Sequence, residues 1–174
     1  MTVKLKILIF FLTISLSVAF GQVKEDKIID IRKKFQIINQ DSSYKTKNLI
    51  NEQFLEQMTD GGGELTGYLK DGKICKIIER IGISYCVRTF EYYFWDRQLI
   101  FVYEQELDPL FNNSTATFDW TRTSLAFEGH YYFDKGKLIE TVMTGKKRIA
   151  DDLDIDKEKK FTTEANRICN LLKE

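Results

Sequence analysis

The residues that would carry chemistry are few, and the most suggestive of them is a run of aspartates. Asp152, Asp154 and Asp156 in "DDLDIDKEKKFT" stand at positions 1, 3 and 5 of a calcium-binding loop. Position 6 of such a loop needs glycine and position 12 needs glutamate, but this chain has Lys157 and Thr163 there. Acidic residues before a helix also cap its free amides, and we predict that role here.

Acid–base and nucleophilic chemistry has equally little support. His130 is the only histidine of the chain and no nucleophile motif surrounds it, so we predict a structural histidine within a strand. Glu91 and Glu104 share a face in the expected sheet register, but they lie diagonally, as exposed glutamates commonly do. We therefore predict no catalytic residue, no cofactor and no metal site.

The three cysteines are Cys75, Cys86 and Cys169. In an oxidising compartment, one disulfide and one free thiol are expected. Alternation along the expected strands puts Cys86 on the core face, so a Cys86–Cys169 bridge that ties the last helix to the sheet fits best. A Cys75–Cys86 bridge stays open, although it would need a bulge or an irregular turn near Gly82.

The N-terminus predicts export. A basic start is followed by an apolar run over residues 7–20, shorter than the roughly 20 residues that a membrane span needs. The sequence "AFG" then offers a small-residue cleavage site after Gly21. We expect residues 1–21 to be a cleaved signal peptide and residues 22–174 to form a single α+β domain. The expected location is secreted or periplasmic, with no membrane anchor after cleavage.

Composition and charge limit the classes of partner. The chain is 43% hydrophobic and 13% aromatic, which is enough for a packed core. Without the two lysines of the signal peptide, 24 basic residues (26 − 2) stand against 26 acidic ones, a net charge near −2. This balance gives no electrostatic footprint for nucleic acid or for an anionic membrane.

Helical periodicity marks both ends of the domain. Apolar residues at three- and four-residue steps predict an amphipathic helix over 24–39, with Ile28, Ile31, Phe35 and Ile38 as its stripe. A weaker stripe predicts a second helix around 45–58, which the glycines of 60–63 would end. A last helix is expected over about 157–173.

From Glu64 the period changes to two, and three hairpins align as "YLKDGKI", "YFWDRQL" and "YFDKGKL". The Asp-Gly and Lys-Gly pairs suit two-residue turns, in which glycine takes a positive φ. The pair Asp96-Arg97 suits such a turn less well, so we expect the middle turn to be longer or rearranged. The predicted fold class is α+β, with an antiparallel meander of about six strands packed on N-terminal and C-terminal helices.

Alternation divides the side chains of these hairpins between two faces. The face expected to form the core includes Phe90, Tyr92, Phe94, Phe101, Tyr103 and Phe133. The opposite face is unusually aromatic, and with the irregular segment 108–124 it supplies the candidate binding residues Tyr68, Tyr93, Trp95, His130, Tyr132 and Trp120. Three explanations stay open: cross-strand packing on an exposed face, a protein-partner surface, or a groove for a small ligand.

Four segments carry a resemblance to a family: "IRKKFQIIN", "GGELTGYL", "EYYFWDRQLIFVYEQE" and "YYFDKGKLI". Together they resemble small, uncharacterised exported proteins of Bacteroidetes-type bacteria. Those proteins share a signal peptide, an N-terminal helix and repeated Y-[FL]-x-[DN]-G-K-[LI] hairpins. The resemblance spans most of residues 22–174, and it implies an architecture and a location but no catalytic residues.

The function expected from these observations is binding. The leading expectation is an exported soluble protein that meets a protein partner in the periplasm or outside the cell, through the aromatic face or segment 108–124. The alternative is a small-ligand carrier with a pocket bordered by Tyr68, Tyr93 and Tyr132. A hydrolase is the third possibility, and it would need a convergent polar cluster that the sequence does not reveal.

Overall fold

A computed structural model describes residues 3–148 and 156–173 of the chain, with the side chains of these residues from Gln22 onward except Thr121. The elements are α1 (Val3–Gln40), β1 (Lys45–Ile50), a 3-10 turn (Asn51–Gln53), β2 (Gly63–Lys70), β3 (Lys73–Ile83), β4 (Cys86–Trp95), β5 (Gln98–Asn112), β6 (Thr117–Asp134), β7 (Lys137–Gly145) and α2 (Lys157–Leu171). In the described residues, seven antiparallel strands form one sheet in chain order, from β1 to β7.

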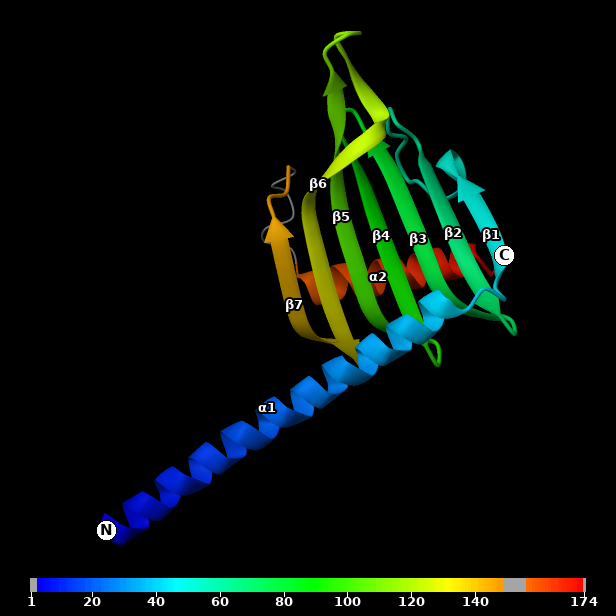
Figure 1. Ribbon diagram of the computed structural model, residues 1–174. Helices are drawn as coiled ribbons and strands as arrows, with labels where there is room; N and C mark the ends of the chain where they lie inside the picture. The colour runs from blue at the N-terminus through cyan, green and yellow to red at the C-terminus, as the bar shows by residue number, and fades with distance from the viewer. Residues whose placement is uncertain (1–2, 149–155, 174) are drawn as a thin grey trace.

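The two helices lie on opposite faces of the sheet. Figure 1 shows α1 crossing the near face close to the β2–β3, β4–β5 and β6–β7 turns, while α2 runs behind the sheet. The result is a helix–sheet–helix arrangement, which confirms the α+β class and an antiparallel sheet. The predicted number of about six strands is too low, because residues 45–50 add β1 to the sheet. Because each strand pairs with its neighbour in the sequence, the sheet needs only short connections.

Both terminal helices bury an apolar stripe, and that of α1 is the predicted one. Ile28, Ile31 and Ile38 of α1 are almost fully buried, and so are Phe161 and Ile168 of α2. In the described part of the chain, no helix combines the length and apolar character needed to cross a membrane.

The aspartates before α2 have an observed role at one position. Asp156 is the N-cap of α2, and its carboxylate accepts a hydrogen bond from the Lys159 amide at 3.2 Å. This is the capping role expected of the acidic run. Asp152 and Asp154 lie outside the described residues.

The predicted helix around 45–58 is wrong. Residues 45–50 form β1, which pairs with β2 in an antiparallel register that sets Leu49 opposite Leu65. The stripe that predicted this helix consists of Leu49, Ile50, Phe54 and Met58. Phe54 is buried and Leu49 packs against the core, but Ile50 and Met58 are exposed. Pairing with β2 provides partners for the backbone hydrogen-bonding groups of this segment. That tertiary interaction overrides the weak helical periodicity of the local sequence.

The three hairpin turns share one geometry. Both central residues have positive φ in each turn: 51° and 71° at Asp71-Gly72, 48° and 64° at Asp96-Arg97, and 50° and 78° at Lys135-Gly136. These are two-residue turns of the type that matches strand twist. The expectation that the middle turn would be longer or rearranged is therefore wrong. Arg97 adopts the positive φ of a two-residue turn, although that conformation normally favours glycine.

Each hairpin also carries one extra residue shortly after its turn. Leu69 pairs with Ile74 and Tyr68 with Lys76, so that Cys75 is left over. The same shift leaves Ile100 unpaired in the second hairpin and Ile139 in the third. An unpaired residue of this kind is a β-bulge, and beyond it the alternation of side chains is reversed.

The bulges redistribute the predicted faces into two cores. The core under α2 contains Leu65, Ile77, Phe90, Tyr92, Phe94, Leu99, Val102, Tyr131 and Phe133, with Phe161 and Ile168 of the helix. The core under α1 contains Ile28, Ile31, Ile38, Tyr93, Ile100, Phe101 and Tyr132. Phe101 and Tyr103 were predicted to lie with Phe94, but they belong to the α1 side because of the bulge at Ile100.

Candidate functional site

The structure contains the predicted aromatic face, but α1 covers its central part. Tyr93 and Tyr132 are both buried, and the Tyr93 ring lies 4.7 Å from that of Phe35 of α1. The Tyr93 hydroxyl donates a hydrogen bond to Glu91 at 2.5 Å. Burial, together with this carboxylate, raises the pKa of Tyr93 well above its ordinary value. These tyrosines act as core residues on a face closed by a helix.

The other predicted residues of this face lie around the edge of α1. Tyr68 and Trp95 are half-buried, beneath the ammonium groups of Lys76 and Lys34 at 5.9 and 5.6 Å from their ring centroids. His130 is half-buried, with its ring edge-on to Tyr103 at 4.9 Å. The structure thus brings Tyr68, Tyr93, Trp95, His130 and Tyr132 to one face, but it does not join them in one open surface.

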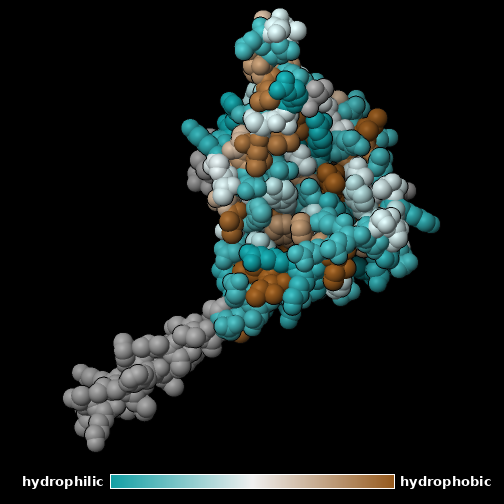
Figure 2. Space-filling model, viewed as in Figure 1, coloured by the Kyte–Doolittle hydropathy of each residue, from teal (hydrophilic) through white to brown (hydrophobic). Residues whose placement is uncertain are grey.

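Trp120 lies apart from that group, on a projecting arm. Segment 108–124 was expected to be irregular, but β5 and β6 continue through most of it as a two-stranded extension in which Phe111 pairs with Phe118. Figures 1 and 2 show this arm standing beyond the rest of the sheet, with apolar atoms along it. Phe111, Phe118 and Trp120 are 53%, 55% and 42% exposed, so they contribute little to the core.

The expected disulfide is not formed. All three cysteines are free thiols, Cys75 and Cys169 half-buried and Cys86 buried. Cys86 begins β4, whereas Cys169 lies near the other end of that strand, beside Phe94. Ten residues of strand span roughly 30 Å, far beyond the reach of a disulfide. Alternation predicted the face of Cys86 correctly, but it carries no information on which end of the sheet α2 would reach.

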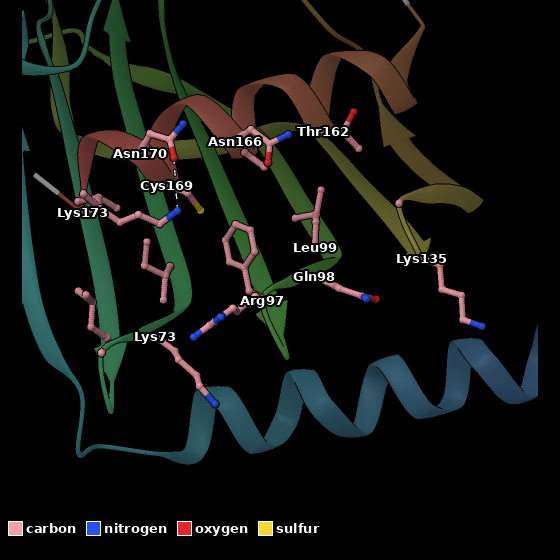
Figure 3. Close-up of a pocket in the computed structure, with 17 residues that line it drawn as sticks. Lys73, Arg97, Gln98, Leu99, Lys135, Thr162, Asn166, Cys169, Asn170 and Lys173 are labelled. Carbon is pink, nitrogen blue, oxygen red and sulfur yellow. Dashed lines mark hydrogen bonds between the residues drawn. The ribbon is translucent and has the colours of Figure 1, made fainter.

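A large pocket lies between α2 and the ends of the hairpins (Figure 3). Its volume is about 750 Å³. The apolar part of the lining comes from both layers and comprises Leu69, Ile74, Phe94, Leu99, Ala165 and Leu172. The sheet and α2 together thus provide a hydrophobic floor, and Cys169 contributes its sulfur to the same wall.

The rim of this pocket is cationic. Lys73, Arg97 and Lys135 lie in or directly after the three hairpin turns, and Lys173 follows the end of α2. Figure 3 shows Lys73 and Arg97 near one another at the open edge, with Lys135 farther along it. No aspartate or glutamate is among the described residues that line the pocket. The polar groups between floor and rim are neutral: Gln98, Thr162, Asn166 and Asn170.

The repeated hairpin sequence accounts for the positive charge of the rim. Each copy carries a cation within its turn or just after it, and the meander places all three turns at the same edge of the sheet. Lys137, which follows the third turn, is paired with Glu158 of α2 at 3.0 Å. From the sequence, these turns were interpreted only through the backbone conformation that glycine favours. The signal that was missed is that every hairpin carries a cation in its turn or directly after it, although Lys73, Arg97 and Lys135 occupy different positions of the aligned copies.

A second polar feature of the α2 side is Glu79, which is only 4% exposed. The Tyr92 hydroxyl donates a hydrogen bond to it at 3.4 Å. Burial, and secondarily the charge of Glu164, raises the pKa of Glu79 to about 7. Its side chain borders a cleft of about 600 Å³ that Lys160, Glu164 and other charged residues share. Nothing in the sequence distinguished Glu79 from an exposed strand glutamate.

A third polar feature is a buried ionic network on β5. Glu104 is fully buried and accepts hydrogen bonds from Lys147 at 2.5 Å, Tyr131 at 2.7 Å and Arg88 at 3.2 Å. Burial alone would raise the pKa of Glu104, but the hydrogen bonds and the positive charges outweigh it and the pKa is lowered. Glu91 lies on the other face, so the expected sharing of a face by Glu91 and Glu104 is wrong.

These arrangements define what the site can do chemically. In the described residues, no group of three or more histidine, cysteine, aspartate or glutamate side chains is placed to hold a metal ion. The pocket of Figure 3 combines an apolar floor with a cationic rim, which suits binding of an amphipathic anion.

Comparisons of this chain with protein-family models, with curated proteins and with solved structures found no match. The resemblance to small exported proteins of Bacteroidetes-type bacteria therefore stays a prediction. The function has to be argued from the site itself.

Proposed function

We propose that this protein is an exported binding protein that holds a small anionic ligand with an apolar body between α2 and the hairpin turns. The observation that carries this proposal is the pocket of about 750 Å³ whose floor is apolar and whose charged lining residues, within the described part of the chain, are all cations. Export rests on the basic start, the apolar run and the cleavage site of residues 1–21.

The two parts of the pocket would act on different parts of a ligand. The floor removes apolar surface from water, at about 25 cal/mol per Å². The rim attracts a carboxylate or a similar anionic group, and it disfavours a cationic ligand of the same shape. A volume of about 750 Å³ suits one flexible chain and its head group. A medium-chain fatty acid is the simplest ligand with this chemistry.

The proposal predicts that decanoate binds and that decanol and decyltrimethylammonium bind at least about fivefold more weakly, because the rim interacts with the negative charge. Isothermal titration calorimetry at low salt would measure all three. Equal affinity for decanoate and decanol would contradict the role of the rim.

Arg97→Gly is the most informative variant for this test. It removes a rim cation, so decanoate should bind about fivefold more weakly. It also relieves a φ of 64° at a position where glycine is favoured, so the free energy of unfolding should rise by about 1 kcal/mol. Weaker binding by a more stable protein cannot result from unfolding. Lys33→Gln, which removes an exposed cation of α1 outside the pocket, is the matched control.

A second candidate function is attachment to a protein partner through the arm of β5 and β6. Adjacent residues of a strand point to opposite faces, so exposed Leu110 and Phe111 make both faces of the arm apolar. A two-stranded ribbon is only marginally stable alone, so a partner that covers these side chains would also order the arm. This observation favours the arm over the sheet face, whose Tyr93 and Tyr132 are buried.

If the arm binds a partner, the double variant Phe111→Ser with Trp120→Ser should no longer recover that partner from the exported fraction of the host. Thermal unfolding should change little, because both side chains are about half exposed. The control replaces Val142 and Met143, which are equally exposed but lie on β7, with serine. Unchanged recovery with the arm variant would rule out this interaction surface.

A further inference from the structure

A second cavity opens on the opposite side of the sheet, beside α1. Its volume is about 330 Å³, less than half that of the pocket under α2. The walls are Ile31 and Phe35 of α1, Phe101 and Tyr103 of β5, and His130 and Tyr132 of β6. Figure 2, which views the molecule from this side, shows apolar atoms along the line where α1 meets the sheet.

The walls of this cavity are mostly ring faces and ring edges. Phe35 and Phe101 meet edge to face, with centroids 5.4 Å apart and planes at 82°. His130 stands at 68° to Phe101 and at 72° to Tyr103. Steep angles of this kind present both edges and faces to the space between the rings. A flat ring that enters the cavity can therefore make edge-to-face contacts on more than one side.

The mouth of the cavity carries a cation on the helix side. Arg32 is exposed, and its guanidinium carbon lies 5.7 Å from the centroid of the Tyr132 ring. The guanidinium thus lies beside this ring, among the residues that line the cavity. Its planar set of N–H donors matches the two oxygens of a carboxylate.

An acidic residue, Glu128, adjoins two residues of the cavity wall, Tyr103 and His130. Glu128 accepts hydrogen bonds from Tyr103 at 2.8 Å and from Thr144 at 3.0 Å, and it lies 3.7 Å from His130 Nε2. A second negative group on a ligand would approach this carboxylate, which disfavours dicarboxylates. These charges thus favour a ligand with one anionic group, placed at Arg32.

The geometry points to a binding site for a planar aromatic monocarboxylate, with its ring among Phe35, Phe101 and Tyr132 and its carboxylate on Arg32. A cavity of about 330 Å³ lies at the small end of ligand sites and suits one ring or two fused rings. This site is separate from the pocket under α2, since the sheet lies between them.

The test uses indole-3-acetate as the probe and His130 as the reporter. Because His130 is the only histidine of the chain, its ring protons give a resolved NMR signal. Titration should move these protons by a saturable ring-current shift. Cyclohexylacetate, which has the carboxylate without the flat ring, and tryptamine, which has the ring with a positive charge, should each bind at least about tenfold more weakly.

Arg32→Gln should weaken indole-3-acetate about tenfold or more, while affinity for the neutral analogue indole-3-ethanol stays unchanged. Lys33→Gln, the neighbouring cation outside the cavity, should leave both affinities unchanged. Arg97→Gly should also have no effect, which separates this site from the pocket under α2. The absence of a saturable His130 shift, equal binding of cyclohexylacetate, or an unchanged affinity in Arg32→Gln would overturn the proposal.

Discussion

Lys147→Met is expected to lower the free energy of unfolding by about 3–5 kcal/mol, because it removes one partner of a buried ion pair. Lys147 donates a hydrogen bond of 2.5 Å to Glu104, which is fully buried. In the variant, Arg88 still contacts Glu104 at 3.2 Å, but it is shared with Glu106 at 3.4 Å. A charge that is buried and only partly compensated costs several kcal/mol.

Urea denaturation followed by circular dichroism would measure the loss. Lys137→Met is the matched control, because its pair with Glu158 has a similar length but Lys137 is 78% exposed. That variant should lose less than about 1 kcal/mol. The double variant Lys147→Met with Glu104→Gln should regain part of the loss, since no charge is then left unpaired. A loss in Lys147→Met no larger than in Lys137→Met would show that the network contributes little.

Glu79→Gln is expected to remove a pH dependence of stability and to stabilise the protein at pH 8. The pKa of Glu79 is raised from 4.5 to about 7 by burial, so the folded state binds its proton more tightly than the unfolded state. The stability contributed by this group is therefore fully present below pH 4.5, and it is lost as the pH rises through 7. A shift of this size corresponds to about 3 kcal/mol between the two limits.

Denaturation midpoints at pH 5 and pH 8 would test this expectation. The wild-type protein should be less stable at pH 8, and Glu79→Gln should lose most of that difference. The exposed Glu64, on the neighbouring strand, provides the control Glu64→Gln, which should keep the wild-type dependence. Glu104 cannot produce the same signal, because its lowered pKa costs stability only as the pH falls. An unchanged pH dependence in Glu79→Gln would show that ionisation of the Glu79 carboxyl does not lower the free energy of unfolding of the wild-type protein.

The elements that the sequence predicted well are those with a strong local signal. The stripe of Ile28, Ile31 and Ile38 spans several turns of α1, and the turns at Asp71-Gly72 and Lys135-Gly136 follow from the backbone preference of glycine. The errors arose where non-local pairing decides the structure. Segment 45–50 becomes a strand because β2 lies beside it, and the arm continues because β5 and β6 pair with each other.

The bulges account for most errors in placing side chains. A single unpaired residue such as Ile100 reverses the face of every residue beyond it, and no residue type marks that position in the sequence. The pocket under α2 was missed for a different reason, because it also depends on contacts between residues distant in the sequence. Lys73, Arg97 and Lys135 were visible as turn residues, but their common pocket depends on where α2 docks. That docking is set by contacts of α2 with residues much earlier in the sequence, such as Phe90 and Tyr131.

The order of the elements has a consequence for the path by which the domain assembles. Each hairpin closes a short loop, so strand pairing requires little loss of chain entropy and can proceed between neighbours. The layer formed by α1 is different, because Ile28, Ile31 and Phe35 pack on residues that come more than 60 positions later, such as Phe101 and Tyr132. The first residues of the domain to be synthesised are thus among the last to find their partners. Until then, both the helix stripe and the tyrosines beneath it face water.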